Sequence, residues 1–289
     1  MKITFGPIGK SGSSRYMEAV MACLADRADV ARFWGVPDTQ ADCIIWFKRA
    51  DRLAAWGQGR DLRNVVFMPI DKLRTAEAAT ELLAKLPTLK LVIASSRQWI
   101  DEVNPDLPCR WLPHPILYVD ERPHEWTPDG PILCVAAAPY APDVKEWLAE
   151  VDPPRPVRIL AASSERFVGR PGDIVREWSP ELQRKWQQRC VAAVDVKSDC
   201  FWHRTKPETK AMEMLAAGLP VAVHRRSAAA SSSANLMCEL GTGRGLPRLD
   251  EMEWLLSKEL HDMVQEMRPD VVRTYSPQTV ADLLWSMLR

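Results

Sequence analysis

The sequence predicts an α/β protein built from two domains, each with a parallel sheet. Short apolar strands alternate with amphipathic helices along nearly all of the 289 residues. This alternation is typical of parallel strands joined by helical crossovers. It is interrupted once, by the proline-rich and charged stretch 118–131, and then starts again. At roughly 100–200 residues per domain the length also fits two domains, so we predict two Rossmann-like halves, 1–117 and 118–289.

The first half begins with a short apolar strand and ends before the proline-rich stretch. Runs rich in Ile, Val, Leu and Phe predict strands at 2–5, 42–47, 64–68 and 90–96. Apolar residues at helical spacing predict helices at 15–27, 76–86 and 97–103. The segment 109–116 closes this half, and the prolines and charges of 118–131 mark the linker.

The second half repeats the pattern. Apolar runs predict strands at 132–138, 157–163, 173–178 and 192–196. Helices are expected at 143–151, 179–190, about 250–267 and about 276–288. Between them, residues 204–223 read as a helix that ends at a glycine and continues as a β-branched strand.

Composition excludes several classes of protein. Hydrophobic residues make up 46% of the chain, and 38 basic residues balance 38 acidic ones. This neutral balance argues against duplex DNA or an anionic membrane as a bulk electrostatic partner. No apolar run approaches the ~20 residues of a membrane span. Seven scattered cysteines without a CxxC pair predict reduced thiols and a cytoplasmic location, and no Asp-x-Asp at a strand exit suggests a metal site.

The stretch RTKPETKAMEMLAAGLPVAV, from Arg204 to Val223, carries helix boundary signals. Thr205 and Glu208 have the spacing of a capping box, which predicts Thr205 as the N-cap. Gly218 follows the last apolar residues of the helix and is expected at its C′ position.

The same helix places two lysines where positive charge is least favourable. Lys206, Lys210 and Glu213 lie at i, i+4 and i+7, on one helical face. The helix N-terminus is already positive, so a bound anion would turn the lysines from unfavourable to favourable. Glu213, one turn further, is suited to accept hydrogen bonds from sugar hydroxyls. The alternative is a solvated charged face in which Glu208 and Glu213 offset the lysines.

The segment KPETKAMEMLAAGLPVAV, residues 206–223, resembles the nucleotide-sugar motif in the C-terminal domain of GT-B glycosyltransferases. It is similar to the glycosyl-transferase-family-four (group 1) type, in which K-P-x-x-K-x-x-E-x-L-A-x-G-x-P-V occurs. The resemblance implies two Rossmann-like domains facing across a cleft, with a last helix that crosses back to the first. It also implies transfer of a sugar from a UDP- or GDP-linked nucleotide-diphospho-sugar to an acceptor, with retention and without a metal or another cofactor.

The resemblance also implies the donor-binding residues. The glutamate at the position of Glu213 binds the ribose, and amides at the helix start, near Lys206, Thr209 and Lys210, hold the diphosphate. Trp178, at a strand exit, would stack on the base, and Arg166 would help neutralise the diphosphate. Ordinary packing of the tryptophan is the alternative.

Candidate residues of the first domain lie at strand exits. The loop GPIGKSGSSRY, residues 6–16, lacks the P-loop spacing, but in a GT-B protein its Gly12, Ser13 and Arg15 would face the cleft. Lys48 follows the second strand, and His114 lies near the domain junction. A surface turn and a structural histidine are the alternatives for these two.

Two other functions stay open. A family member with the fuller Glu-x7-Glu pattern has an acidic residue where this chain has Thr205, which favours a degenerate GT-B protein that binds a nucleotide or a polyanion. The sequence does not identify the acceptor, which is expected to be a glycan, a small molecule or a modified nucleic acid. The last of these would make the chain a glycosyltransferase of modified DNA bases.

Overall fold

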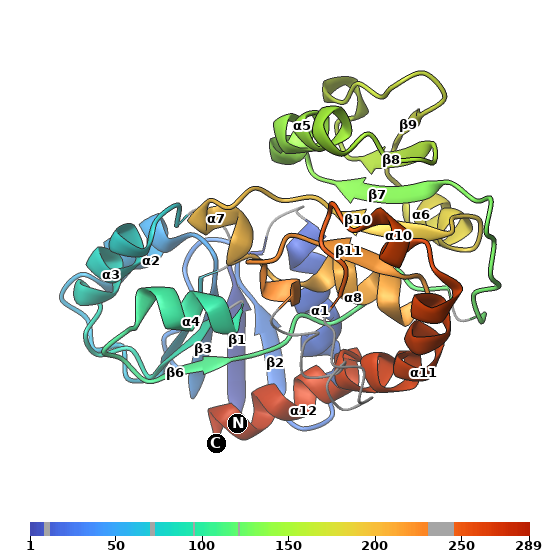
Figure 1. Cartoon of the computed structure of the whole chain (residues 1–289). Coiled ribbons are helices and arrows are strands. Elements are labelled where there is room, and N and C mark those ends of the chain that lie inside the picture. The colour runs from blue at the N-terminus through green and yellow to red at the C-terminus, as the bar shows by residue number, and fades with distance from the viewer. Residues whose placement is uncertain (9–11, 70–72, 95, 121, 231–245) are drawn as a thin grey trace. The chain divides into compact units, whose positions relative to one another are not determined.

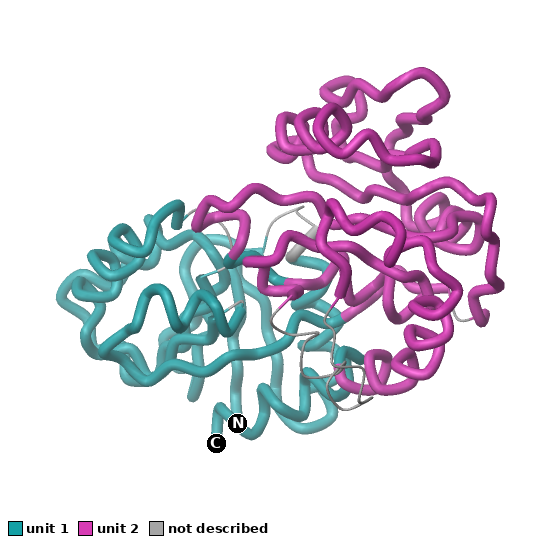
Figure 2. Tube along the Cα trace, viewed as in Figure 1, with its two compact units in different colours: residues 1–115, 205–207, 275–289 teal, residues 116–204, 208–274 magenta. Residues whose placement is uncertain are grey.

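A computed structural model describes residues 1–8, 12–69, 73–94, 96–120, 122–230 and 246–289. The chain divides into two compact units, coloured teal and magenta in Figure 2. Unit 1 comprises residues 1–115, 205–207 and 275–289, and unit 2 comprises residues 116–204 and 208–274. The main division falls between Pro115 and Ile116, and the last helix belongs to unit 1.

Unit 1 is built on a six-stranded, fully parallel sheet in the order β2-β1-β3-β4-β5-β6. Its strands are β1 (Lys2–Gly6), β2 (Asp29–Arg32), β3 (Cys43–Phe47), β4 (Val65–Met68), β5 (Leu91–Ala94) and β6 (Cys109–Trp111). All residues of β3 and β4 are buried, as expected for inner strands covered on both faces. The chain order reverses between β1 and β3, which makes their carboxyl ends the topological switch point of this sheet.

The helices of unit 1 are α1 (Gly12–Leu24), α2 (Ala50–Gly57), α3 (Ala76–Ala84), α4 (Arg97–Val103) and α12 (Pro277–Leu288). The final helix, red in Figure 1, joins the core formed by β1 and α1. Val280, Leu284 and Leu288 form a stripe at i, i+4 and i+8 and are at most 1% exposed. They pack in one cluster with Phe5 and Met17. This stripe ties the C-terminal residues to the first strand of the chain.

Unit 2 contains a five-stranded parallel sheet in the order β11-β10-β7-β8-β9. Its strands are β7 (Ile132–Ala136), β8 (Val157–Ala161), β9 (Ile174–Glu177), β10 (Ala192–Asp195) and β11 (Val221–Val223). A single parallel bridge from Val223 to Arg248 extends the sheet beyond β11. The chain runs from β7 outward to β9 and returns to the other side of β7 at β10. The switch point of this sheet therefore lies at the carboxyl ends of β7 and β10. Both sheets are Rossmann-like, which confirms the predicted fold class.

The helical segments of unit 2 are the 3-10 turns η1 (Ala138–Tyr140) and η2 (Ser164–Arg166) and the helices α5 (Ala141–Val151), α6 (Pro180–Gln187), α7 (Phe201–Arg204), α8 (Thr209–Ala216), α10 (Met252–Leu255) and α11 (Lys258–Thr274). Ser179 caps α6, because its side chain accepts a hydrogen bond from the Leu182 amide at 3.1 Å. Gly218 follows α8 with a φ of +84°, the left-handed geometry predicted for its C′ position. Within the described residues, no helix combines the length and apolarity needed to cross a membrane.

The predicted capping box at Thr205 is wrong. α7 ends at Arg204, and α8 begins only at Thr209, with Glu208 as an N-cap whose side chain makes no capping bond. A helix starting after Thr205 would need Lys206 in helical geometry, and the residue before a proline is driven away from that geometry. Lys206 is therefore not on the helical face that carries Lys210 and Glu213.

Candidate functional site

The switch point of unit 2 gathers polar side chains from three segments of the chain. Tyr140 and Asp143 follow β7, Lys197 and Ser198 follow β10, and Lys210 lies in the first turn of α8. Carboxyl ends of parallel strands at a switch point are where α/β sheets bind ligands. We therefore take this edge of unit 2 as the candidate site.

A buried ion pair lies at the end of β10. The Lys197 ammonium lies 2.8 Å from the Asp195 carboxylate, and the two side chains are only 3% and 4% exposed. Charges so far from water are stable only when they are paired. The pair therefore fixes the backbone where β10 ends.

Asp143, Ser198 and His203 form a second cluster, but not a nucleophilic triad. The His203 Nδ1 atom lies 2.6 Å from the Ser198 hydroxyl and 3.0 Å from the Asp143 carboxylate. A Ser-His-Asp triad uses the two different nitrogens of the imidazole, one for the serine and one for the carboxylate. Here both partners meet the same nitrogen, and Asp143 also accepts from the Ser198 amide at 3.2 Å. The cluster therefore holds the loop after β10 against α5.

Lys210 brings a positive charge from α8 to the loop after β7. Its ammonium lies 4.9 Å from the centre of the Tyr140 ring, a cation–π contact. The Tyr140 ring in turn packs against His203 at 4.6 Å. The N-terminus of α8 and Lys210 thus lie together at the switch point, an arrangement that favours an anion.

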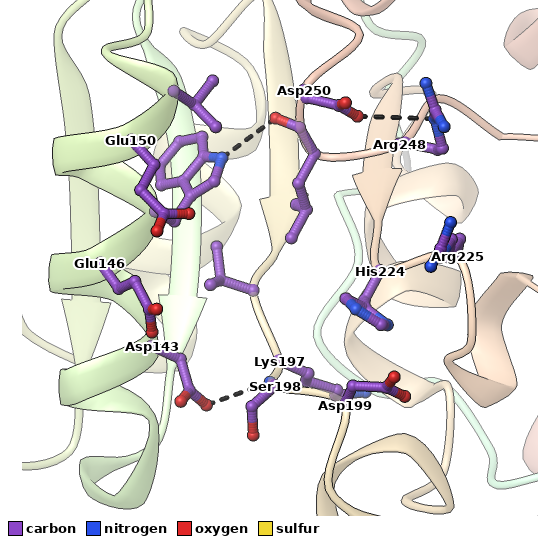
Figure 3. A pocket seen from close by; sticks show the side chains of 14 residues that line it. Asp143, Glu146, Glu150, Lys197, Ser198, Asp199, His224, Arg225, Arg248 and Asp250 are labelled. Atoms are coloured by element: carbon purple, nitrogen blue, oxygen red, sulfur yellow. Dashed lines mark hydrogen bonds and ion pairs between the residues drawn. The ribbon is translucent and has the colours of Figure 1, made fainter.

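A cavity of about 510 Å³ adjoins the switch point, between α5 and the segments that follow β10 and β11 (Figure 3). Carboxylates of α5, including Glu146 and Glu150, line one wall, and His224, Arg225 and Arg248 line the other. Burial lowers the pKa of His224 below its ordinary 6.5. The six residues predicted to bind the donor do not line this cavity, although Lys197 and Ser198 do.

Glu213, the predicted ribose ligand, lies in a buried hydrogen-bond network of unit 2. The side chain is 2% exposed. Its Oε1 atom accepts from the amides of Leu117 and Tyr118, each at 3.2 Å, and its Oε2 atom accepts from Gln183 Nε2 at 3.0 Å. The carboxylate thus holds the first residues of unit 2. The ribose role stays a prediction.

Trp178, the predicted base-stacking residue, belongs to the same network. Its indole Nε1 donates to Gln183 Oε1 at 2.6 Å, and its ring packs edge-on against Tyr118 with centroids 5.1 Å apart. Sequence reasoning missed Gln183 and its neighbour Gln187. The available signal was a pair of amides at i and i+4 on the same face as Trp186, where an amphipathic helix normally carries apolar residues.

The three other predicted donor residues lie in different parts of the chain. Thr209 is the first residue of α8 and is 7% exposed. Lys206 is half-buried and belongs to unit 1. Arg166 lies in η2 with 64% of its side chain exposed, 3.9 Å from Glu165. The structure groups Lys210 with the switch point and Trp178 with Glu213, and Arg166 with neither.

In unit 1, two predicted cleft residues follow the two strands of the switch point. Gly12 is the first residue of α1, which follows β1, and Lys48 directly follows β3 with a φ of +59°. Arg15, in the first turn of α1, is exposed, while the side chain of Ser13 lies outside the described part of the chain. His114 is 5% exposed and packs edge-on against the Tyr16 ring at 4.8 Å.

Among the described residues of both units, no three His, Cys, Asp or Glu side chains are grouped as metal ligands would be.

Comparison with known proteins gives a fold. Neither protein-family models nor curated protein sequences match the chain. The structure is similar to WaaG, a glycosyltransferase involved in lipopolysaccharide biosynthesis, with a TM-score of 0.59 at 12% identity, covering 97% of this chain and 99% of that one. It is equally similar to T4 phage BGT in complex with UDP and Mn²⁺, with a TM-score of 0.59 at 12% identity over 100% and 99% of the two chains. This chain has the GT-B fold. A third similar structure, AviGT4, a glycosyltransferase involved in avilamycin A biosynthesis, has a TM-score of 0.53 at 13% identity and covers 100% of this chain.

Proposed function

We propose that this GT-B protein is a glycosyltransferase that moves a sugar from a UDP- or GDP-linked nucleotide-diphospho-sugar to an acceptor. The observation that carries the proposal is Lys210 in the first turn of α8, with its ammonium at the switch point of the unit 2 sheet. Unit 1, with Lys48 and Arg15 near the ends of its own switch-point strands, would bind the acceptor.

The chemistry needs positive charge where the diphosphate leaves. In the transfer, the bond between the anomeric carbon and the β-phosphate oxygen breaks, and the acceptor oxygen forms the new bond to that carbon. The nucleoside diphosphate departs with the additional negative charge. The N-terminus of α8 carries roughly half a positive charge, and Lys210 adds a full one. These groups would stabilise the leaving diphosphate electrostatically without a divalent ion.

Retention of configuration is part of the proposal. A front-face route, in which the leaving phosphate takes the acceptor proton, requires no separate general base. The Ser198–His203–Asp143 cluster is consistent with this. Both partners meet the same His203 nitrogen, so the cluster holds the loop after β10 in place and does not activate Ser198 as a nucleophile. The proposal thus assigns catalysis to the placement of charge.

Binding is tested first with UDP, GDP, UDP-glucose and GDP-mannose, in EDTA and then with Mg²⁺, by thermal shift and calorimetry. One diphosphate family should raise the melting temperature in EDTA, since a ligand that binds only the native state stabilises it. Lys210→Met should weaken that binding at least tenfold, about 1.4 kcal/mol. Lys145→Met, on the exposed side of α5, should leave it unchanged. No shift with any ligand, or equal affinities for both variants, would contradict the proposal.

Turnover separates an enzyme from a degenerate binding protein. The enzyme should release nucleoside diphosphate from the bound nucleotide-sugar, and Lys210→Met should slow the release. If the protein binds the nucleotide-sugar but releases no nucleoside diphosphate, it is a degenerate GT-B protein, which is the alternative that Thr205 favours.

A modified DNA base is the acceptor that one comparison favours. A structure described as the DNA modifying enzyme β-glucosyltransferase matches this chain with a TM-score of 0.58 over its whole length, at 11% identity. Labelled sugar should then appear in DNA whose modified bases carry a hydroxyl group and not in unmodified DNA. Label in a glycan or small molecule alone would reject DNA as the acceptor.

A further inference from the structure

Gln183 occupies the centre of the buried network in unit 2. The residue lies in α6 and is 1% exposed. Its Nε2 atom donates to Glu213 Oε2 at 3.0 Å and to the Tyr118 carbonyl at 3.1 Å, and its Oε1 atom accepts from Trp178 Nε1 at 2.6 Å. One buried amide therefore links two side chains that are far apart in the sequence.

The orientation of this amide has only one solution. An indole N–H can only donate, so the Gln183 oxygen must face Trp178. An ionised carboxylate and a carbonyl can only accept, so the NH₂ group must face Glu213 and Tyr118. Turning the amide over would place a donor against a donor and acceptors against acceptors. The network thus fixes the indole and the carboxylate relative to each other.

We propose that Gln183 is the positioning residue of a nucleoside subsite, in which it sets the spacing between Trp178 at the base and Glu213 at the ribose. The inference rests on the proposed function, because it assigns these two side chains to the nucleotide. It adds a residue that does not itself touch the ligand and a division of labour within the site. Gln183 contributes to the binding of the nucleoside, and Lys210 contributes to the binding of the diphosphate.

The covalent structure of a nucleoside explains why such a link matters. Base and ribose are joined by one glycosidic bond, so a stacking ring and a ribose acceptor must be held at a matching separation. Side chains that are ordered before binding lose less conformational freedom when the ligand arrives. Gln183, buried and held by three hydrogen bonds, supplies that order to both partners at once.

The chain provides a matched control one turn further along α6. Gln187 is 0% exposed, and its Nε2 atom donates to the same Tyr118 carbonyl at 3.0 Å. Its Oε1 atom accepts from the Asp120 amide at 3.2 Å, and none of the hydrogen bonds described for it reaches Trp178 or Glu213. Gln187→Met thus removes an equally buried amide from the same helix without breaking the link between the two candidate ligand residues.

The test compares Gln183→Met with Gln187→Met in the full-length protein, after circular dichroism has established that both fold. Calorimetry measures Kd for UDP, for GDP and for inorganic pyrophosphate. Gln183→Met should raise the Kd of the preferred nucleoside diphosphate at least tenfold and leave that of pyrophosphate unchanged, whereas Gln187→Met should change neither. In turnover, Gln183→Met should raise the KM for the donor more than it lowers kcat.

Two results overturn the inference. One rejects only the role of Gln183, and the other also rejects the proposed function. Equal nucleotide affinities for Gln183→Met and Gln187→Met, in a native protein that binds UDP or GDP, would remove the role of Gln183 and leave the proposed function standing. A native protein that binds neither nucleotide would remove both. If Gln183→Met does not fold, Gln183→Asn keeps a buried amide but shortens the side chain by one methylene, which withdraws the amide from Trp178 and Glu213, and the same comparison applies to it.

Discussion

Glu213→Gln should destabilise unit 2 although it changes only one atom of the side chain. The carboxylate accepts two backbone amides at one oxygen and the Gln183 NH₂ group at the other. The amide of the variant keeps one acceptor oxygen. Its NH₂ group must then face either Gln183 or the two backbone amides, and the first choice loses fewer bonds. One buried donor-to-donor contact replaces one hydrogen bond, which costs about 2 kcal/mol.

A double-mutant cycle tests the pairing itself. Gln183→Glu places a carboxylate opposite Glu213 and should cost at least as much as Glu213→Gln. In the double variant the new carboxylate accepts both from the new amide and from Trp178, and Gln187 still donates to the Tyr118 carbonyl at 3.0 Å. We expect a favourable coupling of at least about 1 kcal/mol in the cycle.

Urea unfolding followed by circular dichroism measures the coupling, with the far-UV signal and tryptophan emission recorded together because the chain has two units. Additive effects would show that the two side chains do not exchange a hydrogen bond. If Glu213→Gln leaves the free energy of unfolding unchanged, the carboxylate does not hold the start of unit 2.

Three further predictions follow from single contacts. Lys197→Met strands the buried Asp195 carboxylate and should cost about 3–5 kcal/mol in urea unfolding, while the double change with Asp195→Leu should recover most of it. Burial lowers the pKa of His124, so the unfolded chain binds the proton more readily. Stability should fall as the pH drops below 6.5, and His124→Asn should flatten that part of the pH profile. Gly218→Ala must hold a side chain at a φ of +84° and should lower the free energy of unfolding by at least about 1 kcal/mol, visible as a lower melting temperature.

The alternation of strands and helices was predictable because it depends on short-range patterns. The inner strands are runs of buried apolar residues such as 43–47 and 132–136, and the sequence shows these runs directly. β2 was missed because Asp29–Arg32 has charged ends and little burial, and only its pairing with β1 makes it a strand. The expected single helix at about 250–267 is wrong for a different reason. α10 and α11 are separate, and α11 continues through Pro269, where a local rule predicts an end.

One candidate residue stands out in the sequence by its charge. A lysine in the first turn of a helix, such as Lys210, is unfavourable unless something negative binds there, and its role at a ligand stays a prediction. Gln183 gave no such signal, because a glutamine in a helix has good propensity and its value depends on partners from three other segments. Such long-range hydrogen bonds are decided by tertiary packing, which a single sequence does not contain.

The network also changes how the motif glutamate is to be tested. Glu213 accepts hydrogen bonds from the chain itself, so replacing it perturbs the fold and a ligand site together, and weaker nucleotide binding by Glu213→Ala would not separate the two. Lys210→Met and Gln183→Met do separate them. The first removes charge from the place proposed for the diphosphate. The second removes the link proposed to order the nucleoside subsite. If both roles are right, Lys210→Met weakens the binding of pyrophosphate and of the nucleoside diphosphate alike, and Gln183→Met weakens only the latter.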